Sequence, residues 1–511
     1  MLARVWSASL LGINAIRVGV EVDVSGGLPG IAIVGLPDAA VQESRERVRA
    51  ALRNCGYAFP MRRVVINLMP ADLRKEGPSF DLPISLGILA ASDQLNLAHL
   101  SDFLFLGEVS LDGTLHPGSG VLPIAATALK LGFKGIVVPQ ANAPEAAVVS
   151  GLKVYGFETV AEVARFLDRP EEIPPFVSTE PQHLAEAIAT NPSLDLKDVK
   201  GQAHARRALE IAAAGGHNLI FVGPPGSGKT MLARRLPTVL PPLSFNEALE
   251  VTKIYSVAGL LKDRGTLIRS RPFRSPHHSA SGPALVGGGS FPRPGEISLS
   301  HHGILFLDEL TEFKRDVLEF LRQPLEDGFV NISRTRQSVA FPAQFTLVAS
   351  TNPCPCGYYG DSIQACTCSP RQRESYWAKL SGPLMDRIDL QVSVSRLKPS
   401  EMTEVGIGEA SERVRSRVLQ GRQIASQRFQ DEPQLHCNAQ MQSRHLRQWC
   451  QLDDTSRQLL EAAIQRLGLS ARATDRILKV SRTIADLAQS EQLQPPHIAE
   501  AIQYRTLDRM Q

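Results

Sequence analysis

The chain has 511 residues, of which 43% are hydrophobic and 21% are charged, and its formal net charge is +3 at pH 7. These values are typical of a soluble globular protein with about two to four domains, and the small net charge means that any basic surface must be local. No apolar run approaches the roughly 18 residues that span a bilayer, and the N-terminus lacks the apolar core of a secretion signal. We therefore expect a cytoplasmic protein without membrane contact, whose seven cysteines are reduced or bind metal.

Residues 1–167 alternate between short apolar runs and helical patterns, which predicts an α/β or α+β domain without a phosphate-binding loop. Residues 18–24 alternate apolar and polar side chains like a half-buried strand, and residues 122–131 follow a helical pattern. Further strands are expected at 30–35, 63–68 and 135–139, and Asp38 is placed to cap a helix.

The order of motifs in this domain resembles the Lon-type protease domain. Gly77-Pro78-Ser79 matches the nucleophile loop of that family, and residues 107–113 and 132–139 match its later strands and helix. The resemblance implies that Ser79 would need a lysine to take its proton, because a serine hydroxyl is a weak nucleophile unaided.

The residues that should support Ser79 are missing. Leu122 occupies the lysine position and Ile124 the next lysine position, while Phe80 and Asp81 replace the small residues expected after the serine. An apolar side chain cannot act as a base. We therefore expect a non-proteolytic assembly or binding domain, with Ser79 as a relic.

A proline-rich and charged stretch, residues 168–195, predicts a semi-rigid linker before an ATPase core at 196–395. Within the core, the apolar run 218–222 leads into Gly223-Pro224-Pro225-Gly226-Ser227-Gly228-Lys229-Thr230. This sequence has every fixed position of a P-loop between a strand and a helix. Backbone N–H groups would cradle phosphates, Lys229 would reach the outer phosphates, and the Thr230 hydroxyl would hold Mg²⁺. We predict binding of ATP or GTP.

Two further strands supply the other groups that nucleotide hydrolysis needs. Residues 304–307 form an apolar run that ends in Asp308 and Glu309, and residues 345–351 end in Asn352. Asp308 would hold Mg²⁺, Glu309 would deprotonate the attacking water, and Asn352 would help to position that water. This series is that of an AAA+ ATPase.

The AAA+ resemblance implies a site that is shared between subunits and completed by an arginine from the neighbour. Residues 381–390 look like the arginine-finger segment of the magnesium-chelatase and MCM branch, which makes Arg387 the candidate. The alternative is that Arg387 forms a surface ion pair with Asp386 or Asp389.

Two insertions extend the minimal ATPase. Residues 271–296 combine glycine, proline and paired histidines, which predicts a mobile loop facing a ring pore rather than a metal site. A helix from Asp316 to about Leu325 then precedes a β-hairpin over 328–341, with Arg334 and Arg336 at its tip. Resemblance to the MCM branch implies that these arginines contact DNA phosphates, and the alternative is a solvated hairpin tip.

Four of the cysteines, Cys354, Cys356, Cys366 and Cys368, lie within fifteen residues directly after Asn352. Paired thiolates around a glycine-containing loop indicate a structural Zn²⁺ site, although the C-x-C spacing is tighter than usual. Free buried thiols and a redox pair remain alternatives.

Residues 396–511 read as helical and predict a C-terminal helical lid. One apolar stripe at helical spacing ends at Gly468, and Ser470 would cap the next helix. Arg472 at the start of that helix matches the arginine through which an AAA+ lid contacts nucleotide, with Arg476 as the competing choice.

Over nearly its whole length the sequence resembles the YifB/ComM family of magnesium-chelatase-like AAA+ ATPases. The most specific marks are Asn352-Pro353-Cys354-Pro355-Cys356-Gly357, the stretch 273–278 and the Lon-like domain. The resemblance implies a homo-hexameric ring ATPase that uses ATP and Mg²⁺ and drives branch migration of single-stranded or branched DNA during natural transformation. Two alternatives stay open: a protein remodeller like the magnesium-chelatase motor subunit, and an ATP-dependent protease that uses Ser79.

Overall fold

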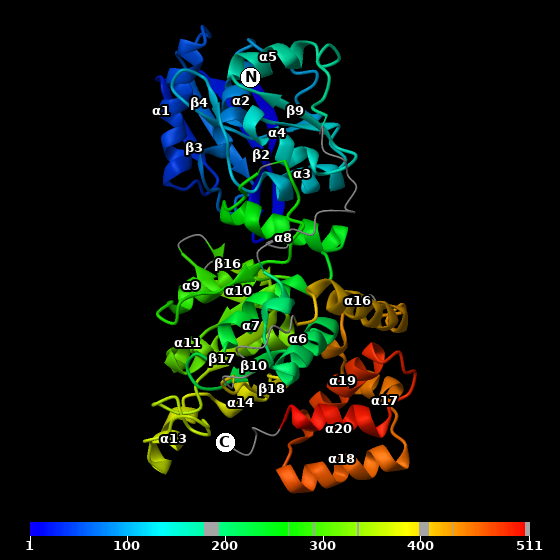
Figure 1. The fold of residues 1–511 in the computed structure, drawn as a ribbon. Helices are drawn as coiled ribbons and strands as arrows, with labels where there is room; N and C mark the ends of the chain where they lie inside the picture. Colours follow the sequence, from blue (N-terminus) through cyan, green and yellow to red (C-terminus); the bar gives the residue numbers. More distant parts are fainter. Residues whose placement is uncertain are drawn as a thin grey trace. The chain divides into compact units, whose positions relative to one another are not determined.

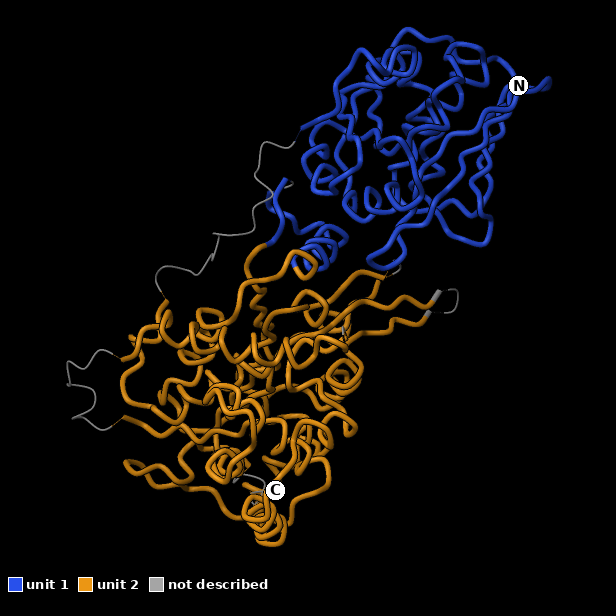
Figure 2. The backbone as a smooth tube through the Cα atoms, turned by 90° about the vertical axis from the view of Figure 1, so that its right-hand side faces the viewer, with its two compact units in different colours: residues 1–185, 248–268 blue, residues 186–247, 269–511 orange. Residues whose placement is uncertain are grey.

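The computed structural model describes residues 1–177, 194–263, 265–289, 292–334, 337–397, 408–432 and 434–505. The chain divides into two compact units, shown in different colours in Figure 2. Unit 1 comprises residues 1–185 and 248–268, and unit 2 comprises residues 186–247 and 269–511. Residues 248–268 fall inside the range 196–395 that the sequence predicts for the ATPase core, yet they fold with unit 1.

Unit 1 is built on a seven-stranded sheet with the order β3-β4-β2-β1-β5-β8-β9. The pairs β1–β2 and β2–β4 are antiparallel, and the other pairs are parallel. The strands of this sheet are β1 (Leu2–Leu11), β2 (Asn14–Ser25), β3 (Gly30–Val34), β4 (Arg63–Met69), β5 (Phe103–Phe105), β8 (Gly135–Pro139) and β9 (Lys153–Phe157). A small hairpin lies beside them, formed by β6 (Glu108–Val109) and β7 (Leu115–His116).

Helices cover both faces of this sheet (Figure 1). The helices α1, α2 and α5 contribute to one apolar core, and α3 and α4 contribute to a second. Their bounds are α1 (Ala39–Asn54), α2 (Asp81–Ala91), α3 (Val121–Lys130), α4 (Ala143–Ala147) and α5 (Val160–Asp168). Asp38 caps α1 as predicted, because its carboxylate accepts a hydrogen bond of 2.8 Å from the Val41 N–H.

Residues 248–268 are tied to unit 1 through the last turn of helix α8 (Phe245–Ala258). The Ser256 hydroxyl donates to the Glu145 carboxylate at 2.5 Å, and the Ser256 carbonyl accepts from the Gly120 N–H at 3.1 Å. Glu145 is only 3% exposed and also accepts from the Leu122 N–H at 3.0 Å. A buried carboxylate is costly without donors, so these bonds fix the segment in unit 1.

Unit 2 contains a five-stranded parallel sheet with the order β11-β14-β17-β10-β18. The strands are β10 (Leu219–Val222), β11 (Phe273–Arg274), β14 (Ile304–Leu307), β17 (Thr346–Thr351) and β18 (Leu390–Ser393). All strands run in one direction, so their carboxyl ends share one edge. The three loops that carry the predicted nucleotide-binding residues therefore meet there.

Short helices and two hairpins surround this sheet. The helices are α6 (Ala203–Gly215), α7 (Lys229–Arg235), α9 (Gly282–Val286), α10 (Glu296–Leu299), α11 (Arg315–Glu319), α12 (Arg322–Asp327), α13 (Pro370–Trp377) and α14 (Gly382–Met385). The hairpins pair β12 (Gly287–Gly288) with β13 (Arg293–Pro294), and β15 (Phe329–Arg334) with β16 (Gln337–Pro342). The single helix predicted from Asp316 to about Leu325 is wrong, because Pro324 would clash with the carbonyl of Phe320 and the helix breaks there.

The C-terminal part is helical, as predicted (orange to red in Figure 1). Its helices are α16 (Ser411–Arg428), α17 (Ser443–Trp449), α18 (Asp454–Leu467), α19 (Ala471–Leu487) and α20 (Pro495–Gln503). Gly468 ends α18 with a φ of 64°, and the Ser470 hydroxyl caps α19. In the part of the chain that the structure describes, every helix is too short or too polar to cross a membrane.

Candidate nucleotide-binding site

The loop 223–228 joins the buried strand β10 to helix α7 and has the shape of a phosphate cradle. Gly226 and Gly228 have φ values of 77° and 91°, and nothing lies within 4 Å of where a Cβ would sit on either residue. At Gly223, in contrast, a Cβ would lie 2.0 Å from the Val394 carbonyl oxygen. The Ser227 hydroxyl is buried and has no hydrogen-bond partner among the described residues. Open glycines and a buried unpaired hydroxyl at a helix start fit a phosphate ligand.

Lys229 points back into this cradle. Its ammonium donates to the carbonyl oxygens of Gly223 and Pro224 at 2.6 and 2.9 Å, and to Asn352 Oδ1 at 3.2 Å. Burial lowers the pKa of Lys229 from 10.5 to about 8, although the charges of Asp308 and Glu309 oppose the shift. All three acceptors are neutral oxygens, so the ammonium would gain by exchanging them for anionic phosphate oxygens.

Asp308 follows β14 and faces Thr230 from α7. The Thr230 hydroxyl donates to one Asp308 carboxylate oxygen at 2.9 Å, and the Ser350 hydroxyl donates to the other. A hydroxyl beside a carboxylate is the oxygen donor set that Mg²⁺ prefers, so Thr230 and Asp308 fit that ion.

Glu309 has an unusual backbone. Its φ is 54°, a left-handed value for a residue other than glycine, and its N–H donates to Ser350 Oγ at 3.3 Å. Its side chain remains 57% exposed. The carboxylate therefore projects from a fixed backbone into open space.

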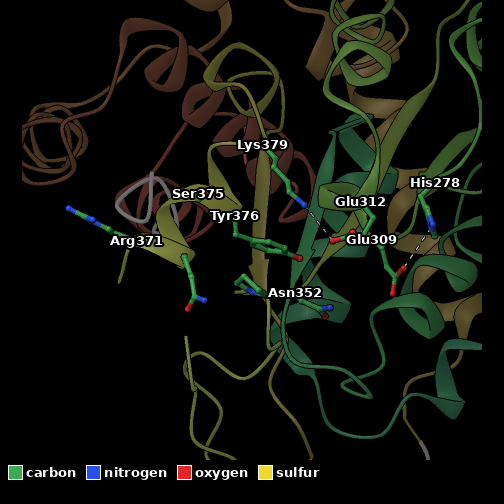
Figure 3. Close-up of a pocket in the computed structure, with 10 residues that line it drawn as sticks. His278, Glu309, Glu312, Asn352, Arg371, Ser375, Tyr376 and Lys379 are labelled. Carbon is green, nitrogen blue, oxygen red and sulfur yellow. Dashed lines mark ion pairs between the residues drawn. The ribbon is translucent and has the colours of Figure 1, made fainter. Parts of the chain in front are cut away.

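A cavity of about 690 Å³ opens beside Asn352, and its lining side chains are shown in Figure 3. One side is formed by the residues that follow β14 and β17, and another by helix α13 and its C-terminal end. Glu309 Oε2 lies 3.8 Å from His278 Nδ1, and Glu312 lies 3.9 Å from Lys379 Nζ. The lining residues are His278, Glu309, Glu312, Asn352, Pro355, Arg371, Gln372, Ser375, Tyr376 and Lys379.

The four cysteines predicted as a metal site converge. The Sγ of Cys354 lies 3.3 Å from that of Cys356 and 3.7 Å from that of Cys366, and all four sulfurs lie within 4.8 Å of one another. A tetrahedral Zn²⁺ with Zn–S bonds of about 2.3 Å sets its sulfurs roughly 3.8 Å apart, so the residues fit this ion. A hydrogen bond from the Tyr358 backbone lowers the pKa of Cys356 to about 5.

The cysteine cluster also touches the P-loop. A Cβ on Gly357 would lie 2.8 Å from Pro225, and the Trp377 indole donates to the Pro353 carbonyl at 3.1 Å. Cys368 directly precedes Ser369, which caps α13. The cluster thus connects the phosphate cradle to the helix that lines the cavity.

Arg387, the predicted arginine finger, is buried in the structure. Its side chain is 7% exposed, forms an ion pair with Glu326 and donates to the Pro383 carbonyl at 2.5 Å. The ion pair with Asp386 or Asp389 does not form. Although burial opposes ionisation of Asp389, its neighbours Arg476, at 2.5 Å, and His217 lower its pKa.

Arg472 lies near Arg387. Both line a cavity of about 130 Å³ together with Glu326, Asp386, Asp475, Arg476 and Lys479. None of the described residues that line this cavity comes from the P-loop. The structure therefore groups Arg472 and its competitor Arg476 with the candidate finger, and a contact with nucleotide remains a prediction.

The predicted hairpin after α12 is present, and Arg334 pairs with Gln337 at the end of β15. Thr335 and Arg336 lie outside the described residues. The DNA contacts predicted for Arg334 and Arg336 remain predictions.

Three family models match consecutive parts of the chain. "Subunit ChlI of Mg-chelatase" matches residues 20–142, "Magnesium chelatase, subunit ChlI" matches 195–402, and the C-terminal part of the same subunit matches 408–505. Competence protein ComM of Haemophilus influenzae is 46% identical over 513 residues, covering 100% of this chain and 98% of that protein. The chain belongs to the ComM/YifB family of magnesium-chelatase-like AAA+ ATPases.

Other relatives agree with this family. YifB of Escherichia coli is 43% identical over 510 residues, covering 100% of this chain and 98% of that protein. The Lon protease of Salinispora arenicola is 26% identical over 168 residues, which are 30% of this chain and 21% of that protease. The ComM/YifB fold therefore comprises a Lon-like α+β domain, a magnesium-chelatase-type AAA+ core and a helical C-terminal part.

Some site residues of this ComM/YifB protein escaped sequence analysis. The sequence predicts that the paired histidines belong to a mobile loop facing a ring pore, but the structure places His278 beside Glu309. The only sequence feature that points to this position is the pair Phe273–Arg274 shortly before His278. This pair forms the strand β11 next to β14. Arg371 in α13 and Lys379 just after α13 carry no sequence signal, because only the fold brings them to the cavity.

Proposed function

We propose that this ComM/YifB-family protein is an ATP-hydrolysing ring motor that acts on DNA. The observation that carries the proposal is the meeting of Lys229, Thr230, Asp308, Glu309 and Asn352 at one edge of the parallel sheet. Lys229 and Thr230 begin α7, Asp308 and Glu309 follow β14, and Asn352 follows β17. Together they supply a phosphate clamp, an ion ligand pair and a base.

In the proposed reaction, the P-loop and Lys229 hold the β- and γ-phosphates. Mg²⁺, when bound at Thr230 and Asp308, would neutralise charge on the phosphates. Glu309 takes a proton from a water molecule whose oxygen forms a bond to the γ-phosphorus. The bond from the γ-phosphorus to the bridging oxygen breaks, and ADP and inorganic phosphate leave. Asn352, which bonds Lys229 at 3.2 Å, orients the same water.

Arg387 completes the site of a neighbouring subunit in the proposed homo-hexameric ring. To reach a γ-phosphate across an interface, its guanidinium must leave the Glu326 carboxylate and the Pro383 carbonyl. A guanidinium with an unpaired buried Nε has a hydrogen bond to gain from such a move. Ring assembly would therefore control hydrolysis.

The DNA substrate is supported by similarity to the competence protein ComM of Haemophilus influenzae, which is 46% identical over the full chain. We infer branch migration of DNA junctions as the task, with Arg334 and Arg336 contacting phosphates. The four-cysteine cluster would hold one structural Zn²⁺ that braces the P-loop.

The Lon-like domain is proposed to be non-proteolytic. Leu122, at the position where the family has its lysine, is fully buried, and Ile124 is 3% exposed. Because these buried side chains are apolar, neither can accept a proton, and Ser79 lacks the base that the Lon-type family uses.

The deciding experiment measures ATPase rate without DNA, with single-stranded DNA and with a forked junction, in the wild type and in Glu309→Gln. We expect DNA to raise the wild-type rate, and we expect the variant to lose about 100- to 10,000-fold, the usual contribution of a general base. ATPase activity that survives in Glu309→Gln would contradict the assigned base.

The second candidate is an ATP-driven protein remodeller, which the three magnesium-chelatase family models favour. Its signature would be an ATPase rate that depends on Glu309 but is indifferent to every DNA. DNA affinity that is unchanged in Arg334→Glu/Arg336→Glu would also favour this candidate, because the phosphate contacts of a DNA motor are sensitive to charge reversal.

A further inference from the structure

The segment 39–63, which comprises helix α1 and the chain up to the start of β4, concentrates positive charge. It holds six arginines, two glutamates and no other charged residue, a net charge of +4 against +3 for the whole chain. Arg47 is used inside unit 1, because its guanidinium donates to the buried Asp81 carboxylate at 2.8 Å. The other five are exposed and form no ion pair with any described residue: Arg45, Arg49, Arg53, Arg62 and Arg63. The rest of the chain is close to neutral, so this basic surface is local.

Three of the exposed arginines form a stripe along α1, which lies on the outside of unit 1 (Figure 1). Arg45, Arg49 and Arg53 are spaced four residues apart and so lie on one side of the helix. The Arg49 guanidinium carbon lies 5.9 Å from the centre of the Phe59 ring, so this side faces the loop after α1. At a rise of about 1.5 Å per residue the stripe is about 12 Å long, which matches about three or four phosphates of a DNA strand.

The other two exposed arginines lie at the end of the sheet where α1 ends. The strands β3 and β4 are parallel, with Gly30 opposite Arg63, so the helix between them runs back and ends near the start of β4. Two large apolar side chains are exposed at the same end. Leu28, just before β3, is 90% exposed, and Met61, just before Arg62, is 70% exposed. The surface therefore combines guanidinium groups with apolar side chains.

We propose that the α1 surface, formed by the five exposed arginines with Leu28 and Met61, binds single-stranded DNA. Guanidinium groups attract phosphates of any sequence, and exposed apolar side chains can contact the faces of bases, which a duplex keeps stacked inside. This inference rests on the proposed action on DNA and adds a contact in unit 1 to those predicted for Arg334 and Arg336 in unit 2. Because the P-loop takes no part, the binding should not require ATP.

The test measures the dissociation constant of a labelled oligothymidylate for the full-length protein, without nucleotide, over a series of salt concentrations. Each phosphate contact of a single strand contributes about 0.7 to the slope of log K against log salt. Arg49→Gln/Arg53→Gln should therefore lower the magnitude of the slope by about 1.4 and weaken binding about 25-fold at about 0.1 M salt. Arg49→Lys/Arg53→Lys keeps both charges and should stay within about threefold of the wild type.

The matched control is Lys130→Gln/Lys153→Gln, which removes two exposed positive charges from α3 and β9 of the same unit. Its affinity for the oligothymidylate should stay within about twofold of the wild type. Wild-type affinity and slope in Arg49→Gln/Arg53→Gln would overturn the inference. An equal loss in the lysine variant or in the control would also overturn it, because the cause would then be altered structure or overall charge.

Two single changes test the surroundings of the stripe. Glu46 is exposed next to the stripe and forms no ion pair with a described residue, so Glu46→Gln should tighten DNA binding by about threefold. Met61→Ser should weaken binding of the oligothymidylate by about threefold without changing the salt slope, and should not affect a duplex of the same length. Equal effects of Met61→Ser on both DNAs would contradict the preference for a single strand.

The surface could also be tested against a membrane, because basic and apolar side chains together suit anionic lipid as well. If Arg49→Gln/Arg53→Gln loses binding to phosphatidylserine vesicles but keeps its affinity for the oligothymidylate, the surface belongs to a membrane and the inference is overturned.

The ATPase assay separates this inference from the proposed function. If DNA stimulates hydrolysis and Arg49→Gln/Arg53→Gln binds DNA like the wild type, the α1 surface is wrong and the proposed motor stands. If the variant loses DNA binding while wild-type hydrolysis is indifferent to every DNA, the α1 surface stands and the motor is wrong. A wild-type protein that binds no DNA would overturn both.

Discussion

Two glycine-containing loops in this protein, one in each unit, follow a similar plan but differ in what surrounds them. The P-loop follows β10 and leads into α7, and the loop Gly77-Pro78-Ser79 leads into α2. Gly226 and Gly77 have nearly the same left-handed φ, 77° and 79°. Both backbones are therefore shaped to present groups at the start of a helix.

The side chains that meet each loop are different. Around the P-loop, polar groups from three strands face open space, and Lys229 holds only neutral oxygens that a phosphate could replace. Around Ser79, the polar groups bond one another: Asp81 is completely buried and pairs with Arg47 at 2.8 Å. The two loops therefore share a backbone geometry, whereas the reaction that each loop can support depends on side chains from other helices and strands.

The largest effect is expected from Leu122→Lys, which places a lysine where the Lon-type family has its base. Leu122 is fully buried, so the change removes a buried leucine and places an ammonium in an apolar core. We expect unit 1 to lose about 3 kcal/mol of stability and to gain no peptidase activity. Hydrogen exchange of the β1 and β8 amides measures the stability, and cleavage of a fluorogenic peptide with ATP measures the activity.

Leu111→Lys is the control, because Leu111 lies in the same unit and is 57% exposed. Its exchange rates should match the wild type within error. ATP-dependent peptide cleavage by Leu122→Lys, blocked by a second change Ser79→Ala, would show that the loop kept its catalytic capacity.

A smaller effect is expected from Cys356→Ser, compared with Cys55→Ser in unit 1. We expect about one Zn²⁺ per chain in the wild type and Cys55→Ser, and loss of the ion in Cys356→Ser. Because Gly357 packs on Pro225, loss of the ion should loosen the P-loop and lower kcat/KM for ATP about tenfold, equivalent to roughly 1.4 kcal/mol. Mass spectrometry measures the zinc content, and steady-state kinetics measure kcat/KM. One Zn²⁺ per chain in Cys356→Ser would contradict the assignment of the cluster as the metal site.

Sequence analysis found the features that short, local patterns encode. The alternation of residues 18–24 predicted a strand that is part of β2, and Asp38 was found as a cap because caps act within three residues. The convergence of the P-loop, Asp308 and Asn352 was also predictable, because parallel strands place their ends at one edge.

What escaped the sequence depends on packing between distant segments. Nothing in residues 248–268 indicates that Ser256 bonds Glu145, more than one hundred positions earlier. The burial of Arg387 against Glu326 is similar, since an arginine in a short loop between a helix and a strand is compatible with either an exposed or a buried side chain. Long-range pairing of this kind leaves no periodic trace in the sequence.

The subtlest difference between the two loops concerns a carboxyl group three residues before Ser79. Burial raises the pKa of Glu76 from 4.5 to about 7, and the charge of Asp38 adds to the shift while Arg74 opposes it. A folded-state pKa above the unfolded value means that the protonated form is favoured in the fold. The stabilisation that this protonation gives is therefore present below pH 4.5 and is lost as the pH rises toward 7.

Glu76→Gln keeps the shape of the group but never ionises. At pH 8.5 the variant should be more stable than the wild type by about 1 kcal/mol, and near pH 4.5 the difference should nearly vanish. Slower hydrogen exchange of the β3 and β4 amides, compared at equal pH, would report this gain, and Glu46→Gln, at an exposed position on α1, should show none. A gain that is equal at both pH values would mean that ionisation of Glu76 is not its cause. A gain confined to high pH would show that this loop retains an unfavourable buried charge at neutral pH without any catalytic partner to use it.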